Sequence, residues 1–91
     1  MDARPMELRD TVELMSSADY KERFLAEYLQ LGLRYDKLRY MLERHDEGTL
    51  NFTPTCPIEL LRVQEKAMAA YLHCLKLRAE FEGVKLTNDL R

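Results

Sequence analysis

The sequence predicts an all-α fold: an antiparallel two-helix hairpin, preceded by a short helix, that oligomerises through its helices. Two long segments, residues 19–47 and 57–82, carry apolar residues every three or four positions, the repeat of a helix with one buried face. A glycine follows each segment, where a left-handed residue can end a helix. Of the 91 residues, 46% are hydrophobic and 33% are charged, which is typical of a globular, helix-rich chain.

The chain is expected to form one domain because 91 residues are too few for two cores. Asp19 and Glu22 have the spacing of a capping box at the start of the second helix. Pro5 and Pro57 suit the first turns of the first and third helices. The predicted segments are a short helix at 5–15, a long helix at 19–47, an ordered loop at 48–56, a long helix at 57–82 and a tail at 83–91.

The two long helices have more apolar surface than one hairpin contact can cover. The seam predicted for the second helix contains Phe24, Tyr28, Leu31, Tyr35, Leu38, Leu42 and His45. The third helix has one stripe with Ile58, Leu61, Met68, Leu72, Leu75 and Ala79, and a second with Leu60, Ala67, Tyr71, Cys74 and Phe81. One stripe can pack on the second helix. The other is left for the short first helix or another subunit, and we therefore expect a homo-oligomer.

Composition argues against several classes of protein. The formal charge of −2 gives no overall basic field for duplex DNA. The charged start lacks the apolar region of a signal peptide, and no apolar run reaches the roughly 20 residues of a membrane helix. Two cysteines without an export signal suggest reduced thiols. A cytoplasmic protein with no membrane partner is expected.

The sequence offers little for metal or covalent chemistry. His45, Cys56, His73 and Cys74 are the candidate zinc ligands, but adjacent residues of a helix point about 100° apart. No second close pair completes a zinc site, so we expect no metal. Glycine-rich phosphate loops, G-x-S-x-G and H-E-x-x-H are absent from the sequence. We expect neither an enzyme nor a cofactor.

A basic strip with a tyrosine is the main candidate for ligand binding. Arg34, Lys37, Tyr40 and Arg44 recur at steps of three and four in the second helix. Arginine and lysine hold phosphates, and tyrosine stacks on bases. The alternative is a solvated face, in which Lys37 and Arg44 pair with Glu43 or with acids on a neighbour. A smaller cluster contains Tyr20 and Lys21.

The loop at 48–56 has two readings. Leu50 and Phe52 can attach it to the end of the hairpin and Pro54 can stiffen it, which requires no ligand. Alternatively, the hydroxyls of Thr53 and Thr55 contribute to a pocket.

One stretch of the sequence resembles a known family. The run EGTLNFTPTCPIELL is followed by Glu65, Met68, Tyr71-Leu72, Leu75, Arg78-Ala79-Glu80 and Glu82-Gly83, and is preceded by YKERFLAEY and RYDKL. Over residues 20–86 these motifs resemble a family of short tailed-phage proteins labelled crAss-like-phage-related. Its design is similar to that of phage sponge proteins, which form oligomers and sequester the nucleotide signals of CBASS and Thoeris immunity.

The resemblance implies a phage protein, in the cytoplasm of an infected bacterium, that binds a cyclic oligonucleotide or cyclic ADP-ribose-type signal without cleaving it. An adaptor or inhibitor that docks on a host or phage protein is the alternative, and a DNA-binding regulator is the third possibility. The residues expected to bind the ligand are Arg34, Lys37, Tyr40, Arg44, Lys21, Tyr20, Thr53 and Thr55.

Overall fold

The computed structural model describes residues 6–86, and this part of the chain contains helices and no strand. The prediction of an all-α fold is confirmed. The elements are a 3-10 helix η1 (Leu8–Thr11), and the α-helices α1 (Val12–Met15), α2 (Tyr20–Asp46) and α3 (Ile58–Glu82).

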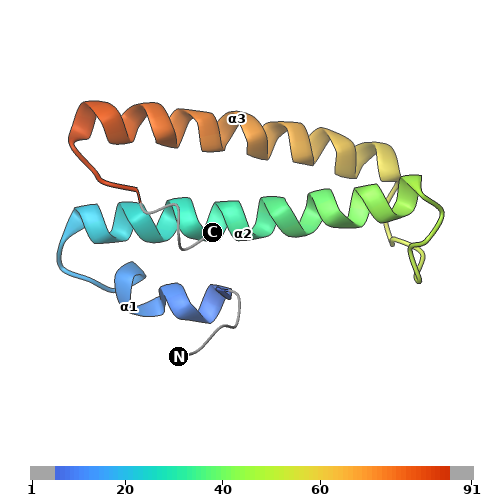
Figure 1. Ribbon diagram of the computed structural model, residues 1–91, viewed down its shortest axis with the longest axis horizontal. Helices are drawn as coiled ribbons and strands as arrows, with labels where there is room; N and C mark the ends of the chain where they lie inside the picture. The colour runs from blue at the N-terminus through green and yellow to red at the C-terminus, as the bar shows by residue number, and fades with distance from the viewer. Residues whose placement is uncertain (1–5, 87–91) are drawn as a thin grey trace.

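The two long helices lie side by side and run in opposite directions (Figure 1). The η1–α1 segment lies along the N-terminal half of α2, on the side away from α3 (Figure 1). The η1–α1 segment therefore leaves the C-terminal half of α2 uncovered, and α3 and the loop after α2 pack there. Among the described helices, none is long and apolar enough to cross a membrane.

The core sits at the end of the molecule where three layers meet. Its buried residues come from α2, α3 and the segment after α3, and include Leu29 and Leu75, which are 0% and 1% exposed. Met6 and Leu14 pack against this cluster from the N-terminal segment. The predicted inner stripe of α3 agrees with this arrangement, because its members are all buried or half-buried. Buried apolar surface thus holds the short helix and the hairpin together.

The start of α2 follows the predicted N-cap residue, with one correction. The Asp19 carboxylate accepts a hydrogen bond from the Lys21 backbone N–H (2.9 Å), as expected of an N-cap. The predicted capping box with Glu22 is wrong. Ser17 Oγ accepts from the Asp19 backbone N–H (3.0 Å) and donates to the Glu22 carboxylate, so both groups of the box have another partner.

The predicted helix at 5–15 is divided into two short pieces. Residues 8–11 are a 3-10 helix and residues 12–15 a single α-helical turn; Pro5 lies outside the described residues. Gly48 (φ 74°) and Gly83 (φ 68°) both have the left-handed conformation predicted from their positions after the long helices.

A buried hydroxyl fixes the N-terminal segment to α2. Thr11 is 0% exposed, donates to the Leu8 carbonyl (2.7 Å) and accepts from Gln30 Nε2 on α2 (2.8 Å). Both hydrogen-bonding roles of the hydroxyl are used, which offsets the cost of burying it. Thr11 is the polar contact that orients η1 and α1 on the hairpin.

We expect Thr11→Val to lower the free energy of unfolding by about 1–2 kcal/mol, because it removes both bonds and leaves the Gln30 amide without this partner. Chemical denaturation measures the change. Thr11→Ser is the matched control because it keeps the hydroxyl, and it should lose less than the valine variant. Equal losses in the two variants would assign the effect to packing of the methyl group.

An ion pair joins the two long helices at the loop end. Arg62 in the second turn of α3 donates Nη1 to Asp46 Oδ2 (3.3 Å) and Nη2 to Oδ1, at the last residue of α2. The hydrogen bond from Arg62 lowers the pKa of the Asp46 carboxyl below its ordinary value of 3.8. Both side chains are close to half exposed, so the pair positions the helix ends more than it stabilises the fold.

The lowered pKa gives the pair a defined pH dependence. A carboxyl with a lowered folded-state pKa contributes stability above its unfolded pKa, and loses it as the pH falls through the folded value. The difference in melting temperature between wild type and Asp46→Asn should therefore shrink as the pH falls below about 4. Glu47→Gln is the control, because Glu47 forms no ion pair with a described residue. A difference that does not change with pH would contradict the assignment.

Candidate functional site

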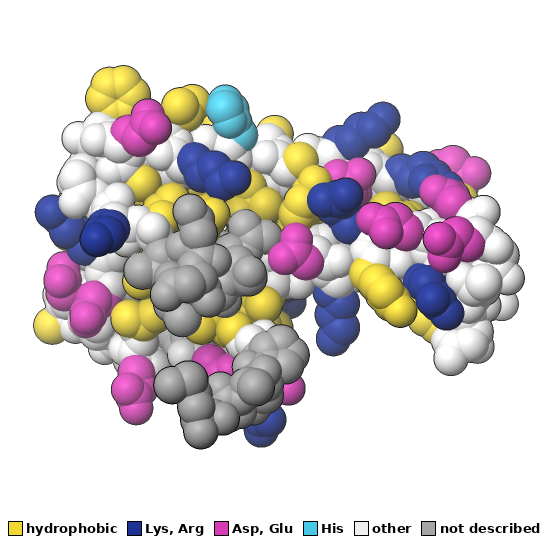
Figure 2. All heavy atoms as spheres, viewed as in Figure 1, with side chains coloured by type: hydrophobic (Ala, Val, Ile, Leu, Met, Phe, Trp, Pro, Cys, Tyr) yellow, Lys and Arg dark blue, Asp and Glu magenta, His cyan; other side chains and the backbone are white. Residues whose placement is uncertain are grey.

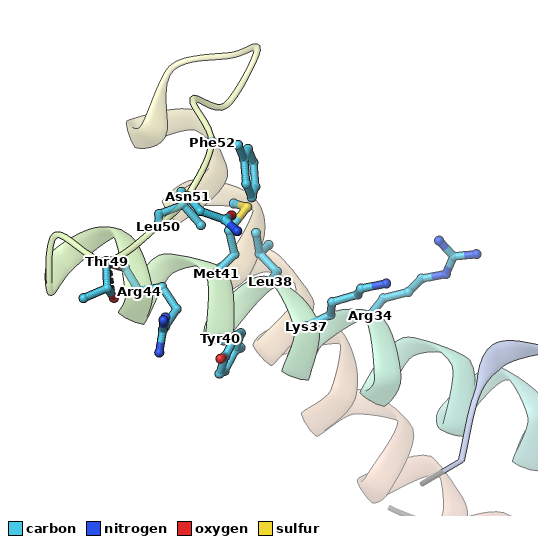
Figure 3. Close-up of a pocket in the computed structure, with 10 residues that line it drawn as sticks. All are labelled: Arg34, Lys37, Leu38, Tyr40, Met41, Arg44, Thr49, Leu50, Asn51 and Phe52. Carbon is cyan, nitrogen blue, oxygen red and sulfur yellow. Dashed lines mark hydrogen bonds between the residues drawn. The ribbon is translucent and has the colours of Figure 1, made fainter. Parts of the chain in front are cut away.

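An open cavity of about 640 Å³ lies between the C-terminal half of α2 and the loop that follows it. Its size is within the range of about 300–1,000 Å³ that is usual for small-ligand sites. Ten residues, labelled in Figure 3, line it: Arg34, Lys37, Leu38, Tyr40, Met41, Arg44, Thr49, Leu50, Asn51 and Phe52. All of them come from one continuous piece of chain.

Helix periodicity brings the polar side chains of the cavity together. Arg34 and Lys37 extend side by side in the same direction from α2, and Tyr40 and Arg44 lie beside each other further along the helix (Figure 3). The Arg44 guanidinium carbon is 5.7 Å from the centre of the Tyr40 ring, within cation–π distance. This contact aligns a cation with an aromatic ring at the mouth of the cavity.

The cavity has three cations and no carboxylate among its lining residues. None of Arg34, Lys37 and Arg44 forms an ion pair with a described carboxylate, whereas the neighbouring Arg39 pairs with Glu43 (3.6 Å). The alternative in which Lys37 and Arg44 pair with Glu43 is therefore not what the structure shows. Positive charge without a neighbouring acid favours an anionic ligand.

The loop supplies the apolar wall of the cavity. Gly48 reverses the chain, and Thr49 then donates both its backbone N–H (2.9 Å) and its hydroxyl (3.2 Å) to the Arg44 carbonyl. These bonds fold the loop back onto α2, where Leu50 is half-buried. Phe52 remains 54% exposed beside the cavity, with a ring face free to contact a ligand.

A model of the protein family described as Sequestin matches residues 18–81. The chain belongs to the Sequestin family. The match covers more than two thirds of the chain and includes α2, the loop and nearly all of α3, so it contains every residue that lines the cavity. No match to a curated protein or to a solved structure accompanies it.

The family name indicates a protein that sequesters a ligand. This agrees with the resemblance to sponge proteins over a similar span of the sequence. The match does not carry the crAss-like label, which stays a prediction.

The structure of this Sequestin family member brings four of the eight predicted ligand-binding residues into one cavity. Tyr20 and Lys21 lie at the other end of α2, where Lys21 Nζ donates to the Gly83 carbonyl (3.2 Å) at the end of α3. Thr53 and Thr55 are exposed in the loop and do not line the cavity.

Several lining residues of this Sequestin were not among the predicted site residues. Thr49, Leu50, Asn51 and Phe52 are the main ones, and the exposed Phe52 is the most prominent of them. The large apolar residues in this loop are the feature of the sequence that could have indicated that the loop lines a cavity.

Within residues 6–86 no group of three or more potential ligands is placed to hold a metal ion, and Cys56 and Cys74 are both free thiols.

Proposed function

We propose that this protein sequesters a nucleotide immune signal, of the cyclic oligonucleotide or cyclic ADP-ribose type, in the cavity between α2 and the loop. One observation carries the proposal: the cavity combines three cations, none paired with an acid of residues 6–86, and two exposed aromatic rings. Phosphates are bound by such cations, and bases stack on such rings.

In this proposal the aromatic rings contact the base of the nucleotide and the cations contact its phosphates. Tyr40 and Phe52 are 62% and 54% exposed, so each offers a ring face without moving core residues. Arg34 and Lys37 extend away from the loop that carries Phe52 (Figure 3). A bound nucleotide would place its base toward Phe52 and its phosphates toward Arg34 and Lys37.

Binding without cleavage is part of the proposal. The cavity residues include no carboxylate, histidine or cysteine, the groups that most often act as general acids, general bases or nucleophiles. The ligand is held through charge and stacking, and the protein acts by lowering the free concentration of the signal. The phage setting, with CBASS or Thoeris as the opposed defence, follows from the sequence resemblance.

Isothermal titration calorimetry against cyclic dinucleotides, cyclic trinucleotides and cyclic ADP-ribose isomers tests the proposal. At least one compound should bind with a micromolar or lower Kd, and chromatography should recover it intact after prolonged incubation. Adenosine without a phosphate is the matched control ligand and should bind far more weakly. The absence of binding by every compound at millimolar concentration would refute nucleotide sequestration and favour the adaptor alternative.

A further inference from the structure

The face of α3 that points away from α2 carries an apolar stripe along almost the whole helix. Its members are spaced alternately by three and four residues, the repeat of a helix that packs along another helix. Every one of them is exposed, with Phe81 at 90% and Val63 at 63%. The outer stripe comprises Leu60, Val63, Ala67, Ala70, Cys74, Leu77 and Phe81.

No described part of the chain covers the outer stripe. The core stripe of α3, represented by Leu72 and Leu75, lies about 150° away around the helix at 100° per residue. The short N-terminal segment, which the sequence left as a possible cover, packs on α2 instead. Figure 2 shows apolar side chains standing along the free edge of the molecule formed by α3. An apolar stripe of this length on a small protein marks an interaction surface.

We infer that the outer stripe binds the same stripe of a second copy, with the two α3 helices antiparallel. The stripe is self-complementary in this orientation, as a two-fold interface requires. We place the two-fold axis at the level of residue 72 along α3, on the side of the outer stripe. Large residues of one copy then face smaller residues of the other. The facing pairs are Phe81 with Val63, Leu77 with Ala67, and Cys74 with Ala70.

Charges beside the stripe favour the same register. Lys66 and Glu80 flank the outer stripe on one side, and neither forms an ion pair with a described residue. In the antiparallel register Lys66 of one copy lies opposite Glu80 of the other, and the pair occurs twice. A parallel pairing would instead place His73 opposite Arg78 and Lys66 opposite Tyr71, which gives no ion pair. Flanking charges of this kind set the orientation of paired helices.

The extent of the stripe suits a stable dimer. In this register residues 63–81 of each copy face each other, and they span about 28 Å of helix at 1.5 Å per residue. Specific dimers bury about 800 Å² on each partner, and a helix face of this length provides an area on the order of that value. The dimer surface belongs to α3, whereas the nucleotide cavity belongs to α2 and the loop, so each copy keeps its own cavity. The dimer and the proposed nucleotide binding are therefore tested separately.

Sedimentation equilibrium of the full chain at micromolar concentration tests the dimer. The wild type should have a mass of 21.6 kDa, twice the 10.8 kDa of one chain. Leu77→Glu should be monomeric with unchanged helix content by circular dichroism. Leu8→Glu makes the same substitution at a residue of similar exposure (38% against 44%) and should remain a dimer. A monomeric wild type, or equal dissociation by both variants, would overturn the inference.

Cysteine and charge-reversal variants test the register. In a Cys56→Ser background, Ala70→Cys should give a disulfide-linked dimer under mild oxidation, through Cys74 of the other copy. A link between two Cys74 residues without Ala70→Cys would indicate parallel helices and overturn the register.

Lys66→Glu and Glu80→Lys should each weaken the dimer at least several-fold, and the double variant should restore it. A double variant that is weaker than either single variant would contradict the proposed ion pair.

Discussion

Replacing Arg34 and Arg44 together by alanine should weaken nucleotide binding by about 100-fold or more. A hydrogen bond to a charged group contributes about 1.5–3 kcal/mol, and each 1.4 kcal/mol corresponds to a tenfold change in Kd. The two side chains enter the cavity from separate turns of α2 and neither has a described acid partner. Their loss removes two of the three positive charges that line the cavity. Calorimetry with the tightest-binding compound measures the effect.

Arg39→Ala is the matched control for this prediction. Arg39 lies on the same helix and is exposed, but it pairs with Glu43 and does not line the cavity. Its replacement should change the affinity less than three-fold. If Arg39→Ala and the double variant weaken binding equally, overall charge rather than the cavity determines affinity, and the site assignment fails. The melting temperature of both variants should stay within a few degrees of the wild type, since the replaced side chains lie outside the core.

The second large effect concerns the core. Leu29→Ala should lower the free energy of unfolding by about 2–5 kcal/mol, because Leu29 is fully buried where the short N-terminal segment, α2 and α3 meet. A domain of this size has a total stability of about 5–15 kcal/mol, so this single change removes a large share of it. At about 4–8 °C per kcal/mol, the melting temperature should fall by about 8 °C or more.

Leu8→Ala provides the comparison. It removes the same atoms from a side chain that is 38% exposed, and it should cost no more than about 1 kcal/mol. Thermal unfolding is measured for both variants at one protein concentration, since self-association shifts the midpoint. If both variants lose the same stability, burial of Leu29 in the core does not stabilise the fold more than the partly exposed Leu8 does.

Much of the fold could be predicted because one face of each long helix repeats at helical spacing. Leu72, Leu75 and Ala79 of α3 are buried as the repeat indicates. The seam predicted along α2 holds only in part: Phe24 and Tyr28 are buried, whereas His45 is exposed. Burial decreases along α2 because its N-terminal half is covered by α3 and the η1–α1 segment, whereas its C-terminal half is covered by α3 and a short loop that leaves an open cavity. Sequence periodicity shows which face is apolar, but not how many neighbours that face has.

The candidate site, like the fold, could be predicted from the sequence only in part. Arg34, Lys37, Tyr40 and Arg44 could be grouped from sequence because they share one helix, where spacing fixes direction. Lys21 was predicted from residue type as part of a separate, smaller cluster with Tyr20, and in the structure its Nζ bonds to the Gly83 carbonyl at the end of α3. The contribution of Phe52 depends on how the loop turns at Gly48 and bonds back to Arg44. A loop conformation of this kind follows from tertiary contacts, which spacing does not encode.

The cavity between α2 and the loop has one consequence for how such a protein can diversify. All ten lining residues fall within residues 34–52, a stretch of 19 positions when both ends are counted. The part of α2 in this stretch lies beside α3, and the main buried core lies toward the opposite end of the hairpin. Substitutions at the lining positions can therefore change ligand preference, while Leu42 and Asp46 in the same stretch keep their contacts with the rest of the hairpin.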